Sequence, residues 1–158
     1  MSEDIFKHWS NLRTCDVYEP WKDKETHFSK YNAKNLENYM RKRIKEAFDP
    51  EHGYYRRTSV GLVDLPLMTY KRVDLDKIPR ARVVEQAPKA VCASASMPGV
   101  FEAVEFRGNY SYDGGVVHYV DPESAIQRCL PLVDNDEKRI IMDVVLLDGE
   151  GIELLDKN

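Results

Sequence analysis

The sequence predicts an α/β fold with a largely parallel sheet that helices cover on both faces. Two β-branched apolar runs, residues 58–65 and 139–147, have the composition of buried strands. Residues 83–94 and 122–130, which lie between them, space their apolar side chains as helices do. Strands that alternate with helices are typical of a parallel sheet.

Two amphipathic helices are predicted in the first third of the chain. The first, residues 3–13, places apolar side chains at helical intervals, and the second, residues 33–48, does the same and ends before Pro50. Residues 18–32 mix aromatic side chains with charges and Pro20. This composition predicts an ordered loop that is held by its large side chains.

One face of the predicted helix 33–48 is basic. It carries Arg41, Lys42, Arg43 and Lys45. Such a face is either solvated, which is the more frequent case, or rests against anionic lipid headgroups in a peripheral membrane contact.

The middle of the chain predicts a hairpin followed by a helix. The strand at 58–65 is followed by a short partner at 68–73, and the charged residues of 74–82 predict a surface connection. The helix predicted at 83–94 contains Pro88, which a helix tolerates best in its first turn.

Composition bounds the class of protein. The chain has 158 residues, enough for one domain, and its net charge of −4 gives no global attraction to nucleic acid, so we expect no nucleic-acid partner. Neither the cysteines nor the histidines have metal-ligand spacing, which predicts reduced thiols and no metal or other cofactor. These residues are Cys15, Cys92 and Cys129, and His8, His27, His52 and His118.

No segment reads as a signal peptide or a transmembrane helix. The N-terminus lacks a basic stretch followed by an apolar core, and the longest apolar run, residues 142–147, is far too short to span a bilayer. We therefore expect an intracellular protein that is cytoplasmic or peripheral to a membrane.

The sharpest chemical signal lies between residues 93 and 126. Residues 93–96 are all small, and a Met-Pro-Gly-Val-Phe run follows at 97–101. Further on, Asp113 precedes Gly114 and Gly115, which presents one carboxylate beside peptide groups that allow close backbone approach. An isolated Asp-Gly-Gly is more often a hairpin turn. If backbone packs closely against this loop, the segment 93–96 must be small.

These motifs together resemble the C-terminal motif block of the patatin-like phospholipases. The resemblance implies a three-layer patatin-like architecture, in which residues 1–158 are the C-terminal portion of a single domain and the sheet is incomplete at its N-terminal side. It also implies that Asp113 is the acidic half of a Ser-Asp dyad that hydrolyses acyl esters of phospholipids or acylglycerols, with Gly114 and Gly115 in the active-site loop.

The nucleophile that this chemistry requires is missing from the sequence. The family carries it in a Gly-x-Ser-x-Gly motif, which occurs nowhere in the 158 residues, and the nearest imitations, at 58–61 and 94–99, set no serine between two glycines. Family members also usually have Asn and Pro where this chain has Tyr119 and Asp121. The sequence therefore predicts that the chain is inactive alone.

Three functional hypotheses follow. The chain is the second half of a lipid acyl hydrolase whose serine lies upstream, with a lipid acyl ester as its substrate. Alternatively, it is a noncatalytic interaction protein, or a subunit that a partner chain completes by supplying the serine. In the third hypothesis the chain builds its own triad from Ser94 or Ser96 with His118 and Asp113.

Overall fold

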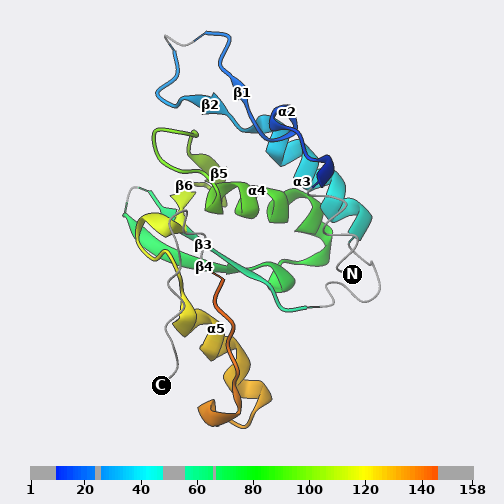
Figure 1. Ribbon diagram of the computed structural model, residues 1–158, viewed down its shortest axis with the longest axis vertical. Coiled ribbons are helices and arrows are strands. Elements are labelled where there is room, and N and C mark those ends of the chain that lie inside the picture. Colours follow the sequence, from blue (N-terminus) through cyan, green and yellow to red (C-terminus); the bar gives the residue numbers. More distant parts are fainter. Residues whose placement is uncertain (1–9, 24–25, 48–55, 66, 146–158) are drawn as a thin grey trace. The chain divides into compact units, whose positions relative to one another are not determined.

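The computed structural model describes residues 10–23, 26–47, 56–65 and 67–145. The chain divides into two compact units, residues 1–121 and 122–158. The first unit contains both of the described sheets and the loop of Asp113 (Figure 1).

The main sheet of the first unit has four strands in the order β4-β3-β6-β5. These are β3 (Ser59–Asp64), β4 (Thr69–Asp74), β5 (Val104–Phe106) and β6 (Asn109–Asp113). The predicted hairpin of residues 58–65 and 68–73 is confirmed, because β3 pairs with β4 over its whole length. Every neighbouring pair in this sheet is antiparallel.

The prediction of a mainly parallel sheet is therefore wrong for the described strands. The connections explain the difference, because a parallel pair needs a crossover of a dozen or more residues. Only residues 65–68 join β3 to β4, and only Arg107 and Gly108 join β5 to β6. Arg107 has φ 52° and Gly108 has φ 83°, the left-handed backbone that favours a two-residue hairpin turn. The mixture of helices and strands still places the chain in the broad α/β class.

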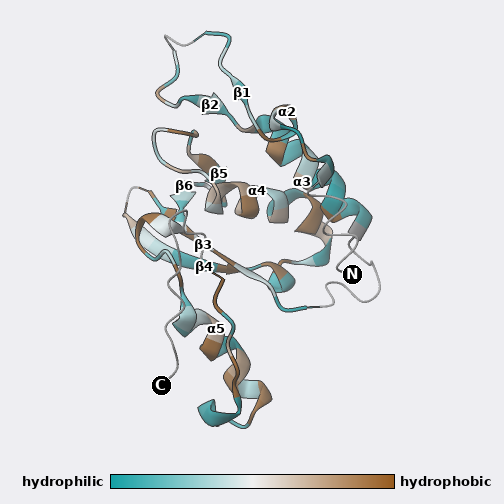
Figure 2. Ribbon diagram, viewed as in Figure 1, coloured by the Kyte–Doolittle hydropathy of each residue, from teal (hydrophilic) through white to brown (hydrophobic). Residues whose placement is uncertain are grey.

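Helix α4 (Val83–Ser94) covers the sheet and supplies much of the core. It contacts β3, β5 and β6, and in Figure 2 apolar residues run along it while much of α3 is polar. The predicted helix 83–94 is confirmed at both ends. The connection before it, predicted to lie on the surface, forms two 3-10 turns, η1 (Leu75–Lys77) and η2 (Arg80–Arg82), and buries Leu75 and Ile78. The buried core consists of Leu62, Val73, Leu75, Ile78, Val83, Ala87, Ala90, Ala93 and Phe106.

Helix α3 (Lys34–Ala47) packs on α4 and supplies a hydrogen bond that α4 lacks. Pro88 is the sixth residue of α4, well inside the helix rather than in the first turn as expected. Because proline has no N–H, the carbonyl of Val84 loses its usual donor four residues on. The guanidinium of Arg41 in α3 donates to that carbonyl over 3.3 Å, so the interior proline is compensated by a neighbouring helix.

Replacing Arg41 tests this compensation. We expect Arg41→Met to lower the free energy of unfolding by about 1 kcal/mol, because the Val84 carbonyl is left without its donor. Arg41 also pairs with Glu37, so Glu37→Gln is the matched control: it removes the ion pair and keeps the guanidinium. Chemical denaturation should show only a few tenths of a kcal/mol for the control. Equal losses would mean that the ion pair, not the carbonyl, is what matters.

The N-terminal part of the described chain packs through aromatic side chains. It contains α2 (Thr14–Val17) and a small antiparallel pair, β1 (Glu19–Pro20) and β2 (Tyr31–Asn32). Tyr18 lies against Tyr31 with ring centroids 4.6 Å apart, and Trp21 stacks on His27 at 3.5 Å. The expected role of large side chains in residues 18–32 is thus confirmed for Tyr18, Trp21 and Tyr31, whereas Phe28 is fully exposed. Most of the predicted helix 3–13 lies outside the described residues.

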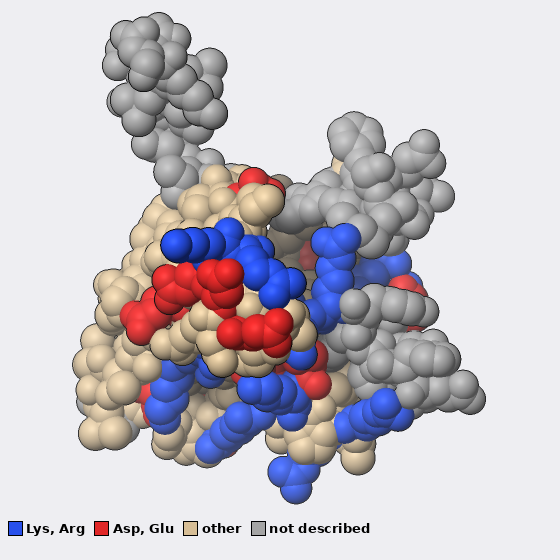
Figure 3. All heavy atoms as spheres, turned by 90° about the horizontal axis from the view of Figure 1, so that it is seen from below, with Lys and Arg blue, Asp and Glu red and all other residues tan. Residues whose placement is uncertain are grey.

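The basic face of α3 is partly neutralised. Arg41 pairs with Glu37 at 2.7 Å and Arg43 pairs with Glu46 at 2.9 Å. The view from below in Figure 3, which is not a view of α3, also shows both acidic and basic side chains on the surface. These pairs favour the solvated interpretation of the helix over an anion-binding surface.

The second unit is built from α5 (Pro122–Cys129) and the 3-10 turns η4 (Leu130–Leu132) and η5 (Glu137–Arg139). Here the helix predicted at 122–130 is confirmed. The strand predicted at 139–147 is wrong as far as it is described, because residues 140–145 have no strand partner. Apolar β-branched composition makes a strand only where a second strand takes up its backbone hydrogen bonds. Among the helices of the described ranges, none has the length and apolar character needed to cross a membrane.

Candidate active site

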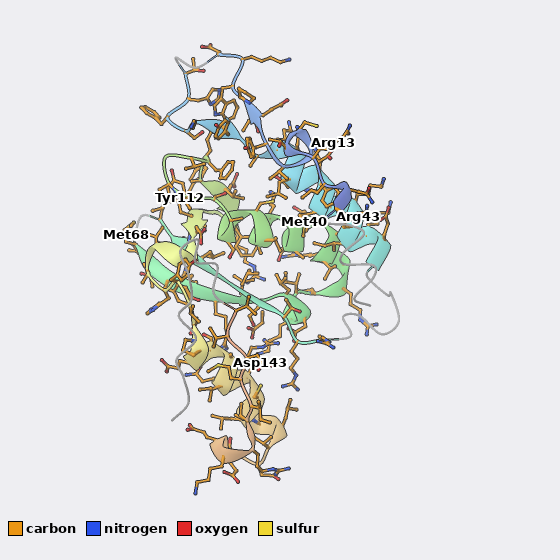
Figure 4. All side chains as sticks on the ribbon, viewed as in Figure 1. Arg13, Met40, Arg43, Met68, Tyr112 and Asp143 are labelled. Atoms are coloured by element: carbon orange, nitrogen blue, oxygen red, sulfur yellow. The ribbon has the colours of Figure 1, made fainter. Side chains whose placement is uncertain are left out.

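Asp113 stands at the end of β6, next to the central strand β3. It is the register partner of Leu62, one of the most buried residues of the core. Tyr112, labelled in Figure 4, is the residue just before it in β6. The sheet therefore fixes the backbone of Asp113 up to the point where the chain turns away.

The turn after β6 orients the carboxylate of Asp113. Its Oδ1 accepts a hydrogen bond of 2.8 Å from the backbone N–H of Gly115 and thereby caps the 3-10 turn η3 (Gly114–Val116). Within the described ranges Oδ2 has no hydrogen-bond partner. The residue is half-buried, so the carboxylate is held by one oxygen while the other remains able to accept a proton or a hydrogen bond.

Gly114 lets this turn lie directly on β3. A Cβ atom at this position would stand 2.6 Å from the carbonyl carbon and 2.7 Å from the oxygen of Gly61, and 2.9 Å from the nitrogen of Leu62. All three are backbone atoms of a central strand. Gly115 is exposed, and the nearest atom to a Cβ there would be Asp113 Oδ1, at 3.2 Å, with Asp113 Cγ and Tyr119 Cδ2 at ordinary contact distances of 3.8 and 3.9 Å. The two glycines thus have different roles: one allows backbone packing and the other leaves room for the carboxylate.

The small residues at the end of α4 pack against the Asp113 loop, as the sequence predicts. The backbone N–H of Asp113 donates to the carbonyl of Ser96 over 3.0 Å. Ala93 and Ser96 are completely buried, and the hydroxyl of Ser96 donates to the carbonyl of Cys92 at 2.7 Å. The small segment 93–96 and the Asp-Gly-Gly segment 113–115, the two halves of the sequence motif, are therefore joined by a backbone hydrogen bond.

The Met-Pro-Gly-Val-Phe run forms a tight turn that holds β2. Gly99 has φ 78°, which a glycine adopts without strain, and the N–H of Phe101 returns to the carbonyl of Met97 over 2.9 Å. The carbonyl of Val100 then accepts from the N–H of Tyr31 at 2.9 Å. This run is therefore a structural connection between α4 and β2.

Sequence reasoning missed a second group of residues beside the Asp113 loop. The hydroxyl of Tyr70 donates to Asp121 over 2.8 Å, and its ring stands edge-on to His118 with centroids 4.8 Å apart. Tyr70 also covers Gly61, where an added Cβ would lie 2.3 Å from the tyrosine oxygen. A glycine inside a predicted strand was the available signal, because it often marks close approach by a neighbour.

The environment of Tyr70 keeps its hydroxyl protonated. Burial raises the pKa of Tyr70 to about 12, and the hydrogen bond to the Asp121 carboxylate adds to the effect. At neutral pH the phenol is therefore a hydrogen-bond donor. Asp121, which departs from the family's usual residue, is used as its acceptor.

The described residues do not assemble the triad of the third hypothesis. The hydroxyl of Ser96 is directed to Cys92, Asp113 is bonded to Gly115, and the ring of His118 lies against Tyr70. Cys92 is no substitute nucleophile, because burial raises the pKa of its thiol to about 12. Across the described ranges, no three metal-ligating side chains of the His, Cys, Asp or Glu type come together.

Neither a curated protein nor a solved structure matches this chain. A family model does match it: that of the patatin-like phospholipases, over residues 1–126. The matched range contains both described sheets and the loop that holds Asp113. Because this model accounts for most of the sequence, the chain belongs to the patatin-like phospholipase family, a family of lipid acyl hydrolases.

Proposed function

We propose that this chain is the acid-bearing part of a lipid acyl hydrolase, with Asp113 as the base of a Ser-Asp dyad. The observation that carries the proposal is the Asp113 carboxylate, which is fixed by the Gly115 N–H at Oδ1 and has no described partner at Oδ2. A general base has to be held in place and still have an accepting atom available. The family match supports an acyl ester of a lipid as the substrate class.

In this mechanism a serine from outside the 158 residues brings its hydroxyl to Oδ2 of Asp113. The carboxylate removes the hydroxyl proton as the serine oxygen attacks the ester carbonyl, and the alcohol of the lipid leaves with a proton. Water then attacks the acyl-serine ester and releases the fatty acid. Donors for the oxyanion must come with the serine, because the family places its glycine-rich loop in that half.

The three-layer architecture of the family belongs to the same proposal. The described part has α4 on the sheet and α3 on α4. We propose that the segment or partner that carries the serine also adds the strands that the resemblance implies are missing. Alone, the chain then folds around Asp113 but does not hydrolyse esters.

Labelling with a fluorophosphonate tests the proposal, because this reagent adds covalently only to an activated serine. We expect the mass of the intact 158-residue chain to be unchanged after treatment. Joined to the Gly-x-Ser-x-Gly half of a patatin-like domain, in one chain or as two, the protein should gain a single adduct and hydrolyse short-chain esters.

Two outcomes would contradict it. A folded joined protein that gains no adduct would favour the noncatalytic interaction protein. An adduct on the chain alone that is lost in Ser96→Ala would mean that the chain contains its own activated serine.

A further inference from the structure

A buried carboxylate away from Asp113 has an unsatisfied oxygen. Asp64, the last residue of β3, is only 3% exposed. Its Oδ2 accepts from the ammonium of Lys71 and from the amide of Asn109, the latter at 3.1 Å. Its Oδ1 is buried and has no hydrogen-bond partner. Leaving such an oxygen unpaired costs about 1–3 kcal/mol, so a donor at this point would be strongly favoured.

Asp64 lines a cavity of about 280 Å³ in the first unit. The apolar side chains of Leu62, Val73 and Phe106 form part of its wall. Lys71 and Arg107 also line it, and both residues are exposed. This size suits a small molecule or a single headgroup, since pockets for drug-sized ligands begin near 300 Å³.

The cavity is separate from the candidate dyad. Lys71, Leu62 and Asp113 are register partners in one row across β4, β3 and β6. Lys71 and Asp113 are therefore two strand spacings apart, about 10 Å between backbones. Asp64 pairs with Ser111, two residues before Asp113 in β6, and Asp113 itself does not line the cavity.

The charges around Asp64 select the kind of ligand. A donor for Oδ1 could be an ammonium or a hydroxyl, but the ammonium of Lys71 already sits on the same carboxylate, and a second cation there would be repelled. A neutral hydroxyl is the better match. Lys71 has two further N–H donors. The guanidinium of Arg107 lies over the Phe106 ring, 4.9 Å from its centroid, and its Nε and Nη2 donate to Gln86 at 3.4 Å. Because a guanidinium has five N–H donors, the others remain for an anion.

We propose that this cavity binds a small phosphorylated polyol. One hydroxyl donates to Asp64 Oδ1, and the phosphate pairs with Lys71 and Arg107. The shared chemistry is that of glycerol phosphate, whether free or as the headgroup of a phosphatidylglycerol-type lipid. The inference stands without Asp113 acting as a base, because it concerns binding only.

Calorimetric titration of the 158-residue chain tests the proposal with four soluble probes. Glycerol phosphate should bind, while sulfate, which has no donor for Oδ1, should bind about tenfold more weakly. Glycerol, which lacks the anion, and phosphoethanolamine, which places a cation near Lys71, should also be weaker. No binding of glycerol phosphate, equal binding of sulfate, or tighter binding of phosphoethanolamine would each overturn it.

Variants locate the site. Arg107→Gln should weaken glycerol phosphate about tenfold, whereas Arg82→Gln, an exposed arginine outside the cavity, should leave the affinity unchanged. Equal effects of the two substitutions would mean that general surface charge attracts glycerol phosphate and that the cavity does not bind it. Vesicles containing phosphatidylglycerol, offered at equal headgroup concentration, separate the sources: competition with glycerol phosphate identifies a lipid headgroup, and its absence identifies a soluble ligand.

Discussion

Replacing Gly114 with alanine should destabilise the first unit by about 3 kcal/mol. The added methyl group would stand 2.6–2.9 Å from backbone atoms of Gly61 and Leu62. A flexible side chain could move aside, but these atoms belong to β3, which is paired on both sides by β4 and β6. Either the turn lifts off the strand or the strand pairing is disturbed. The free energy of unfolding from chemical denaturation measures the loss.

Gly115→Ala is the matched control for this substitution. The single tight contact of its methyl group would be with the carboxylate oxygen of Asp113, at 3.2 Å, and Gly115 is exposed. We expect a loss below about 1 kcal/mol, together with a shifted carboxylate. If both alanine variants are equally stable, the turn does not rest on β3 as closely as described.

The second large effect concerns activity. In the protein joined to its serine-bearing half, Asp113→Asn should lower kcat for a short-chain ester by about 10²–10⁴-fold, the contribution of a general base. An asparagine oxygen can still accept from the Gly115 N–H, so the turn should persist and the unfolding free energy should change little. Ester hydrolysis and fluorophosphonate labelling rate should fall together.

Glu85→Gln serves as the control, because it removes an exposed carboxylate from α4 that is remote from the described turn. Its kcat should equal that of the unmodified protein. Full activity with asparagine at position 113 would mean that another group receives the serine proton.

Local patterns predicted local structure well. The helix at 83–94 has the predicted ends, and the hairpin at 58–65 and 68–73 has the predicted strands. The small residues at 93–96 correctly indicated backbone contact with the Asp113 loop, because only the absence of side-chain bulk permits it. These features depend on residues that are near in sequence, or on the small size of side chains, which can be taken directly from the sequence.

Pairing between distant segments was not predictable in the same way. Alternating helices and strands suggested a parallel sheet, but the two-residue turn at Arg107 and Gly108 fixes an antiparallel one. The apolar run at 139–147 looked like a central strand, yet its described part has no partner. The composition of a segment indicates whether it is buried, whereas the direction in which a strand pairs depends on the connections of the chain and on the neighbouring strands.

The residues around the candidate site show the same limit. Asp113 stands out because of the two glycines that follow it, whereas nothing in the sequence pairs Tyr70 with Asp121 or isolates Asp64 from other aspartates. Those relations arise only when β4 folds beside β3. The proposed binding cavity at Asp64 could therefore be found only from the packed structure.

The two outer strands of the described sheet bear on how the protein behaves when it is concentrated. An outer strand exposes unpaired N–H and C=O groups, and a second copy could add to it and begin an aggregate. Here β5 is only three residues long, and β4 carries adjacent cations, Lys71 and Arg72, in its middle. A short edge and a charged edge both discourage such addition. The sheet that holds Asp113 thus carries its own protection against self-association along its strands.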